Sequence, residues 1–230
     1  MTSSIAGLLF DKDGTLFDFQ STWGPWARQV FLDVARGDAA KAGELAAGLG
    51  YDFANQTFTR DSVIIAGTPD EVAVALLAVA PDWEERDLLG HLNDVAASIP
   101  QVEPVPLIPL LTGFRAAGLR LGVATNDAEA PARAHLATAD ILHLFDFVAG
   151  YDSGFGAKPA TGMQVEFCTK AGLAPEQVAM VGDSTHDLRA GRAAGMTTIG
   201  VLTGMAGKEE LAPFADVILD NIGGIPAWLD

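Results

Sequence analysis

Acidic residues directly follow two apolar segments of the chain. Asp11 and Asp13 follow the run 5–10, and Asp183 follows the run 178–182. Short, continuously apolar runs are typical of strands buried on both faces of a parallel sheet, and open sheets of this kind place their sites at the carboxyl ends of the strands. Carboxylates gathered at one edge would repel each other unless a cation lay among them. The sequence therefore predicts a cation site with oxygen ligands, which suits Mg²⁺.

Polar residues of other kinds are predicted at the same edge of the sheet. Thr125 ends a third apolar run, so its hydroxyl can donate a hydrogen bond to a phosphate oxygen. Asn126 is expected to open a helix, and helix N-termini bind anions. Lys158, in the loop after the next run, supplies a positive charge for both Asp11 and a phosphoryl group. Together these residues predict chemistry on a phosphate ester.

Asp11 and Asp13 have separate expected tasks in such a reaction. The Asp11 carboxylate can attack phosphorus and form an aspartyl-phosphate, with a metal ion to offset the repulsion between two anions. Asp13 lies two residues further on, and in an extended segment such side chains point the same way. It can therefore protonate the leaving oxygen and later deprotonate the attacking water. Gly14 permits the tight turn that follows.

Two acidic residues after the run 178–182 complete the candidate site. Asp183 is the expected second carboxylate ligand of Mg²⁺. Asp187 lies one helical turn later, where it could ligate the ion, orient a metal-bound water or hold Lys158. A purely structural alternative remains for Asp187, because Ser184 and Asp187 have the spacing of a helix capping box.

The elements that must position these residues alternate along most of the chain. Helical stretches separate the apolar runs, and this alternation predicts an α/β fold, a Rossmann-like, doubly wound parallel sheet. The predicted strands are 5–10, 119–125, 145–149, 178–182, 197–201 and 216–219.

One long interval lacks the strand pattern. Between residues 18 and 100 we find only helical periodicity, and some 80 residues are too many for a crossover between neighbouring strands. The proline-rich stretch 100–109 marks the far end of this interval. We therefore predict an α/β core formed by residues 1–17 and 101–230, and an inserted all-helical cap formed by residues 18–100.

The four groups of site residues, taken together, resemble the four motifs of the haloacid dehalogenase superfamily. These are the segment Asp11-Lys-Asp-Gly-Thr15, Thr125, Lys158 and the segment 182–187. The predicted cap resembles the C1-type cap of the phosphoglycolate phosphatase-like branch. The resemblance implies a Mg²⁺-dependent phosphatase that hydrolyses a small phosphorylated metabolite through an aspartyl-phosphate on Asp11. It also implies that the metal ligands are the side chains of Asp11 and Asp183 and the backbone carbonyl of Asp13.

Some residues stand apart from this pattern. Position 12 is lysine where relatives usually carry an apolar residue, and we expect Lys12 to point away from Asp11 and Asp13. His186, at a helix start, is expected to face solvent. Arg60 is the cap cation that could meet a second anionic group of a substrate. Four cap aromatics could line a substrate pocket or form the core of the cap: Trp23, Trp26, Phe53 and Phe58.

Composition excludes several other classes of partner. The chain has 230 residues, with 14 Lys and Arg against 30 Asp and Glu, a net charge of −16. This balance argues against nucleic acid and against anionic membranes, which both require clustered cations. The single cysteine cannot form an intrachain disulfide, and we find neither an export signal nor an apolar run of about 20 residues. We expect a cytoplasmic protein, monomeric or homodimeric.

Alternative functions remain at this point. A phosphomutase of the same superfamily would use the same residues and differ in how its cap protects the phosphoenzyme from water. A dehalogenase would attack carbon and would need neither Asp13 nor Asp183. A non-catalytic ligand-binding module would be expected to have lost one of the key residues. The sequence does not identify the substrate.

Overall fold

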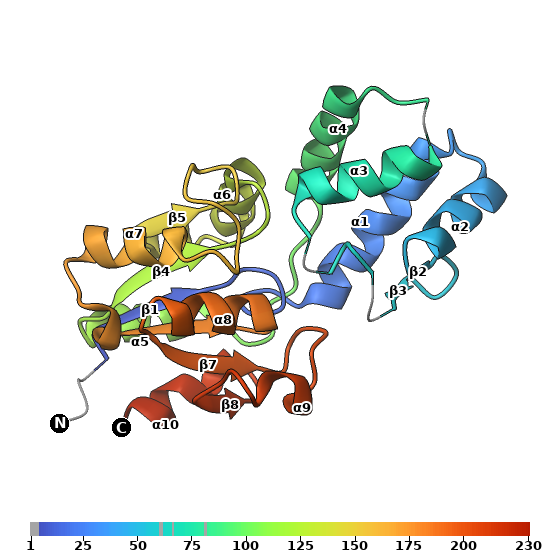
Figure 1. Cartoon of the computed structure of the whole chain (residues 1–230). Coiled ribbons are helices and arrows are strands. Elements are labelled where there is room, and N and C mark those ends of the chain that lie inside the picture. Colours follow the sequence, from blue (N-terminus) through green and yellow to red (C-terminus); the bar gives the residue numbers. More distant parts are fainter. Residues whose placement is uncertain (1–4, 60–61, 66, 81) are drawn as a thin grey trace.

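A computed structural model describes residues 5–59, 62–65, 67–80 and 82–230, and Figure 1 shows the whole chain. Six parallel strands form one sheet in the order β5-β4-β1-β6-β7-β8. The strands are β1 Gly7–Phe10, β4 Arg120–Ala124, β5 Phe147–Ala149, β6 Val178–Gly182, β7 Thr197–Val201 and β8 Val217–Leu219. The chain winds from β1 toward both edges, which makes the sheet doubly wound. The predicted α/β fold class is confirmed.

Helices cover both faces of this sheet. Those of the α/β part are α5 Leu107–Ala116, α6 Glu129–Thr138, α7 Gly162–Ala171, α8 Thr185–Ala193, α9 Lys208–Leu211 and α10 Ile225–Leu229, with short 3₁₀ turns at Leu142–Leu144, Pro175–Gln177 and Ile222–Gly224. Helices α5, α6 and α10 contribute to one apolar cluster, and α7 contributes to the cluster on the opposite face. Among the residues described, no helix has the length and apolar character needed to cross a membrane.

The central strand β1 shows why its sequence is apolar at every position. Leu9 and Phe10 point to opposite faces, since side chains alternate along a strand. Leu9 belongs to the cluster that contains Phe167 of α7. The Phe10 ring stacks on Phe114 of α5, with their centroids 6.3 Å apart. Both residues are fully buried, so neither face of β1 tolerates a polar residue.

The interval 18–100 forms a separate lobe beside the carboxyl edge of the sheet (Figure 1). We call this interval the cap. It contains α1 Phe19–Val34, α2 Ala39–Gly48, α3 Pro69–Val79 and α4 Glu85–Ser98, and it has an apolar cluster of its own. The starts of its helices follow from their capping residues. Asp18 accepts a hydrogen bond from the backbone of Ser21 before α1, and Thr68 forms a capping box with Glu71 before α3.

The cap differs from the sequence prediction in one respect. A two-stranded antiparallel hairpin, β2 Tyr51–Asp52 and β3 Thr57–Phe58, lies between α2 and α3, where we expected helices alone. Tyr51 and Phe58 pair across it and pack into the cap cluster. Each strand has only two residues, too short for an alternating pattern to be recognised. The division of the chain at residues 17/18 and 100/101 stays a prediction.

The double covering of β1 predicts a large cost for truncating its side chains. Leu9→Ala should lower the free energy of unfolding by about 2–5 kcal/mol, because it removes fully buried atoms from a packed cluster. Val165→Ala on α7 is the matched control, since Val165 is 51% exposed, and it should change this free energy by no more than about 0.5 kcal/mol. Urea denaturation measures both, and equal effects would contradict the assignment of Leu9 to the core.

Candidate active site

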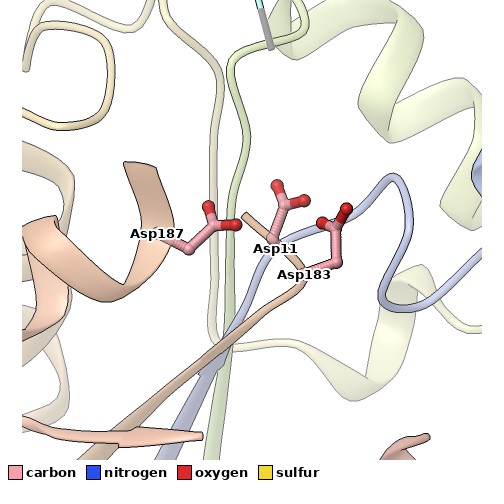
Figure 2. A group of neighbouring side chains, drawn as sticks. All are labelled: Asp11, Asp183 and Asp187. Carbon is pink, nitrogen blue, oxygen red and sulfur yellow. The ribbon is translucent and has the colours of Figure 1, made fainter. Parts of the chain in front are cut away.

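The strand order brings the predicted site residues to one edge of the sheet. Strand β1 lies between β4 and β6, and its last residue, Phe10, pairs with Val123 of β4 and Val181 of β6. Asp11 therefore leaves the sheet beside the residues that follow those two strands. Figure 2 shows the result: the carboxylates of Asp11 and Asp183 lie at the ends of adjacent strands, and Asp187 faces them from α8.

The ammonium of Lys158 joins two of these carboxylates. Its Nζ lies 2.5 Å from Asp11 Oδ1, 2.6 Å from Asp187 Oδ1 and 2.8 Å from the carbonyl oxygen of Ala124. Asp11 and Ala124 accept hydrogen bonds from this ammonium, and Asp187 forms an ion pair with it. Burial alone would lower the pKa of Lys158, but the two carboxylates outweigh it and raise that pKa. Lys158 therefore stays charged.

The loop that carries Lys158 is held by the side chain of Asn126. The Lys158 backbone N–H donates to Asn126 Oδ1 at 2.8 Å, and Asn126 Nδ2 donates to the Lys158 carbonyl at 3.0 Å. Helix α6 begins at Glu129, so the expectation that Asn126 opens a helix is wrong. The segment between β4 and α6 forms a turn, in which the backbone N–H of Asp127 donates to Thr125 Oγ1 at 3.0 Å. Such hydroxyl-to-backbone bonds compete with helix formation.

Asp187 has two partners at once. Its Oδ2 accepts hydrogen bonds from the backbone N–H of Ser184 at 3.0 Å and from Ser184 Oγ at 2.6 Å, which forms the capping box of α8. Its Oδ1 contacts Lys158. Asp187 therefore has both the structural role and one of the functional roles predicted for it, since it caps the helix and holds Lys158.

The three carboxylates form a set that fits a divalent cation. Asp11, Asp183 and Asp187 each offer an oxygen within 4.8 Å of the others. Burial raises the pKa of Asp11 to about 7 and that of Asp183 well above its ordinary value. Three carboxylates face one ammonium, so the unbalanced charge is negative, and hard oxygen donors are the ligands that Mg²⁺ prefers.

Two glycines allow the backbone to approach Asp183 closely. A Cβ at Gly14 would lie 2.4 Å from Asp183 Cγ, and one at Gly204 would lie 1.6 Å from Asp183 Oδ2. Gly14 also has φ +79°, which favours glycine. Thr203 joins the two loops, since its hydroxyl donates to the Gly14 carbonyl at 2.5 Å. Sequence analysis missed Thr203 and Gly204; their only signal is their place after the predicted strand 197–201.

Lys12 is the clearest correction to the sequence analysis. We expected it to point away from Asp13, but its Nζ lies 2.7 Å from Asp13 Oδ1, and the residue is fully buried. The expectation assumed an extended segment. Instead the chain turns at this point, because the backbone N–H groups of Leu16 and Phe17 both donate to the Lys12 carbonyl. The alternation of side chains therefore ends at Asp11.

A cavity that is partly open to solvent lies between the sheet edge and the cap. All seven predicted site residues line it: Asp11, Asp13, Thr125, Asn126, Lys158, Asp183 and Asp187. Trp23 and Trp26 line it from the cap, whereas Phe58 is buried in the cap cluster and Phe53 packs against it. His186 also lines the cavity, rather than facing solvent. Arg60 lies outside the described residues.

The raised pKa values have a consequence for stability. Asp11 binds its proton more tightly in the folded chain, with a pKa of about 7 against 3.8, and Asp183 shifts in the same direction. Between about pH 4 and pH 7 the native state therefore holds more protons than the unfolded chain. The metal-free protein should lose stability as pH rises through this window, and Asp11 alone contributes up to about 4 kcal/mol.

Asp183→Asn tests this dependence of stability on pH, because it removes one buried group that can carry negative charge. Urea unfolding in EDTA at pH 5 and pH 8 should show a smaller loss of stability than in the wild type, and added Mg²⁺ should stabilise the variant less. Asp140→Asn, at a side chain that is 85% exposed, serves as the control and should behave as the wild type. An unchanged pH dependence in Asp183→Asn would contradict the account.

Comparisons with known proteins agree with this geometry. The chain is 29% identical over 226 residues to the probable phosphatase IndB of Dickeya dadantii, covering 95% of this chain and 90% of that protein. It is 28% identical over 206 residues to the fructose-1-phosphate phosphatase YqaB of Escherichia coli, covering 87% and 98%. The structure of a predicted phosphoglycolate phosphatase from Haemophilus somnus has the same fold, with a TM-score of 0.74, 21% identity and 99% of both chains covered. The family profile of haloacid dehalogenase-like hydrolases matches residues 5–195. The chain therefore belongs to the haloacid dehalogenase-like hydrolase family.

Proposed function

We propose that this protein, a phosphatase of the family, hydrolyses a phosphate monoester of a small metabolite in a Mg²⁺-dependent reaction through an aspartyl-phosphate on Asp11. The observation that carries the proposal is the buried contact between Asp11 and Lys158 at the carboxylate edge of the cavity. The names of the two bacterial relatives, both phosphatases, support the reaction class.

The first step is transfer of the phosphoryl group to Asp11. A carboxylate oxygen of Asp11 forms a bond to phosphorus, and the bond between phosphorus and the alcohol oxygen breaks. Asp13, which lines the same cavity, donates a proton to the leaving alcohol. Thr125, Asn126 and Lys158 are assigned to the phosphate oxygens, where hydrogen bonds and the ammonium charge offset the negative charge of the transition state.

The second step returns the enzyme to its starting form. Asp13, now a carboxylate, takes a proton from water, and the water oxygen attacks phosphorus. Inorganic phosphate leaves and the Asp11 carboxylate is regenerated. Asp187 supports both steps by holding Lys158 beside Asp11.

The side chains of Asp11 and Asp183 would hold Mg²⁺, and the family resemblance assigns the Asp13 carbonyl as a further ligand. When bound, the ion would supply the positive charge that lets an anionic nucleophile approach a phosphate. The cap, residues 18–100, is assigned to cover the reacting groups and exclude bulk water.

Phosphate release from phosphorylated metabolites tests the proposal. Activity of the wild type should depend on Mg²⁺ and disappear in EDTA, and Asp11→Asn should lower it by about 10³-fold or more, because the nucleophile is lost. Asp140→Asn should keep wild-type activity, since that side chain is remote and exposed. Normal turnover by a folded Asp11→Asn variant would contradict the covalent route. Silence of the wild type toward every substrate would instead favour the mutase or the binding module.

A further inference from the structure

The cap wall of the cavity is almost entirely apolar. Its large described side chains are Phe19, Trp23, Trp26, Ile64, Ile65 and Leu92. Asn93 contributes the one amide among the described residues of this wall. The carboxylates and Lys158 lie across the cavity, on the sheet edge. A substrate whose phosphate occupies the sheet edge must therefore place its alcohol part against rings and aliphatic side chains.

Few polar groups on this wall can meet a substrate. Trp26 Nε1 already donates to the Leu92 carbonyl at 3.2 Å within the cap. Trp23 Nε1 and Asn93 Oδ1 are buried, and neither has a hydrogen-bond partner among the described residues. Among the described side chains of the wall, the Trp23 N–H and the Asn93 amide are therefore the polar groups left for a substrate. A polyol would leave several hydroxyls without partners there, which is unfavourable in a buried site.

Among the described residues, the positive charge that lines the cavity lies at the phosphate end. Among the described residues that line the cavity, Lys158 is the only lysine or arginine, and Asp11 and Asp187 hold it. A carboxylate on the alcohol part would lie against apolar groups without a counter-charge. Burying an unpaired charge in this way is strongly unfavourable.

We propose that the substrates are phosphate monoesters of alcohols with an aromatic or branched aliphatic body and no second anionic group. The inference rests on the proposed phosphatase function and adds the substrate class. A single hydroxyl or amino group on that body would match Trp23 Nε1 and Asn93 Oδ1.

Competing primary phosphates test the substrate class. The value of kcat/KM for 2-phenylethyl phosphate should exceed those for 2-phosphoglycolate and fructose 1-phosphate by about 10²-fold, the discrimination expected when buried polar groups lack partners. A preference for either of the other two esters would overturn the inference. Turnover of p-nitrophenyl phosphate separates failure of the substrate class from failure of the phosphatase function. If this ester is also inert with Mg²⁺, the phosphatase function itself fails.

A pair of variants at one wall position gives a second test. Ile65→Arg places a cation on the cap wall, so it should shift the ratio of kcat/KM values toward 2-phosphoglycolate by about tenfold or more. Ile65→Met keeps the wall apolar and should retain the wild-type preference. Circular dichroism checks that both variants are folded. The same preference in folded Ile65→Arg as in Ile65→Met would contradict the role of the apolar wall.

A different observation, independent of the cavity wall, carries a second inference. The buried Nζ of Lys12 has three partners around it: Asp13 Oδ1 at 2.7 Å, His135 Nδ1 at 3.0 Å and Asp127 Oδ2 at 3.3 Å. Asp13 and His135 are within hydrogen-bond distance, and Asp127 adds an ion pair. Lys12 is thus held in one place, and it holds one oxygen of Asp13.

His135 connects this cluster to the cap. Its Nε2 lies 2.6 Å from the carbonyl of Ala96 on α4. A carbonyl only accepts hydrogen bonds, so Nε2 carries the proton and Nδ1 accepts from Lys12. Burial and the nearby Lys12 charge lower the pKa of His135 to about 4, which keeps the imidazole in this neutral form.

We infer that Lys12 is a positioning residue for Asp13, and that His135 makes this positioning depend on contact between α4 of the cap and α6 of the core. Lys12 binds Oδ1 of Asp13, and the second oxygen is assigned to the proton of the leaving alcohol. This role rests on the proposed function, because Asp13 acts there as the acid.

Dependence on the leaving group distinguishes positioning from a merely structural role. An alkyl phosphate needs a proton from Asp13 as the alcohol leaves, whereas p-nitrophenolate leaves without one. Lys12→Met and His135→Leu should therefore lower kcat/KM for 2-phenylethyl phosphate by about 10–10²-fold, with little effect on p-nitrophenyl phosphate. His135→Gln can still donate to Ala96 and accept from Lys12, so it should restore most of the loss.

Each outcome of this experiment is decisive. Equal losses for the two esters, or no rescue by His135→Gln, would overturn the positioning role. His135→Leu keeps the test available if Lys12→Met fails to fold. A wild type that hydrolyses neither ester would count against the phosphatase function rather than against Lys12.

Discussion

The ion pairs of Lys158 are the interaction on which the rest of the site depends. One ammonium meets two carboxylates and a carbonyl oxygen at the end of the central strands, while Asp183 lies nearby without a described cation in contact. Buried carboxylates in this number are unstable together unless positive charge is added. These carboxylates gather at one edge of the sheet, and their excess negative charge makes that edge fit a divalent cation.

The architecture explains how such a site is kept in place. Both faces of β1 are covered by helices, so the strand that carries Asp11 is fixed by packing on either side. Loops from β4, β6 and β7 then surround Asp11 and Asp183, and the glycines at 14 and 204 leave no room for side chains there. The described cap residues that line the cavity are mostly apolar. In the proposed function, the sheet edge carries out the chemistry and the apolar wall selects the substrate.

Much of this could be predicted from the sequence, for a physical reason. Strands 178–182 and 197–201 were predicted at the residues where the structure has them, because fully buried strands have uninterrupted apolar runs. The seven site residues line one cavity because the ends of parallel strands share an edge. Lys12 and His135 could not be found in this way: they are 123 positions apart, and only the turn after Asp11 and the packing of α6 bring them together.

The most direct test of the central claim is the location of the phosphoryl group during turnover. Asp13→Asn slows hydrolysis of the intermediate, so acid quenching after mixing with p-nitrophenyl phosphate and Mg²⁺ should leave phosphorylated enzyme. Peptide mapping by mass spectrometry should then find one phosphoryl group, on Asp11. A phosphoryl group on any other residue, or phosphate release by the wild type with no phosphoenzyme in either form, would contradict the account.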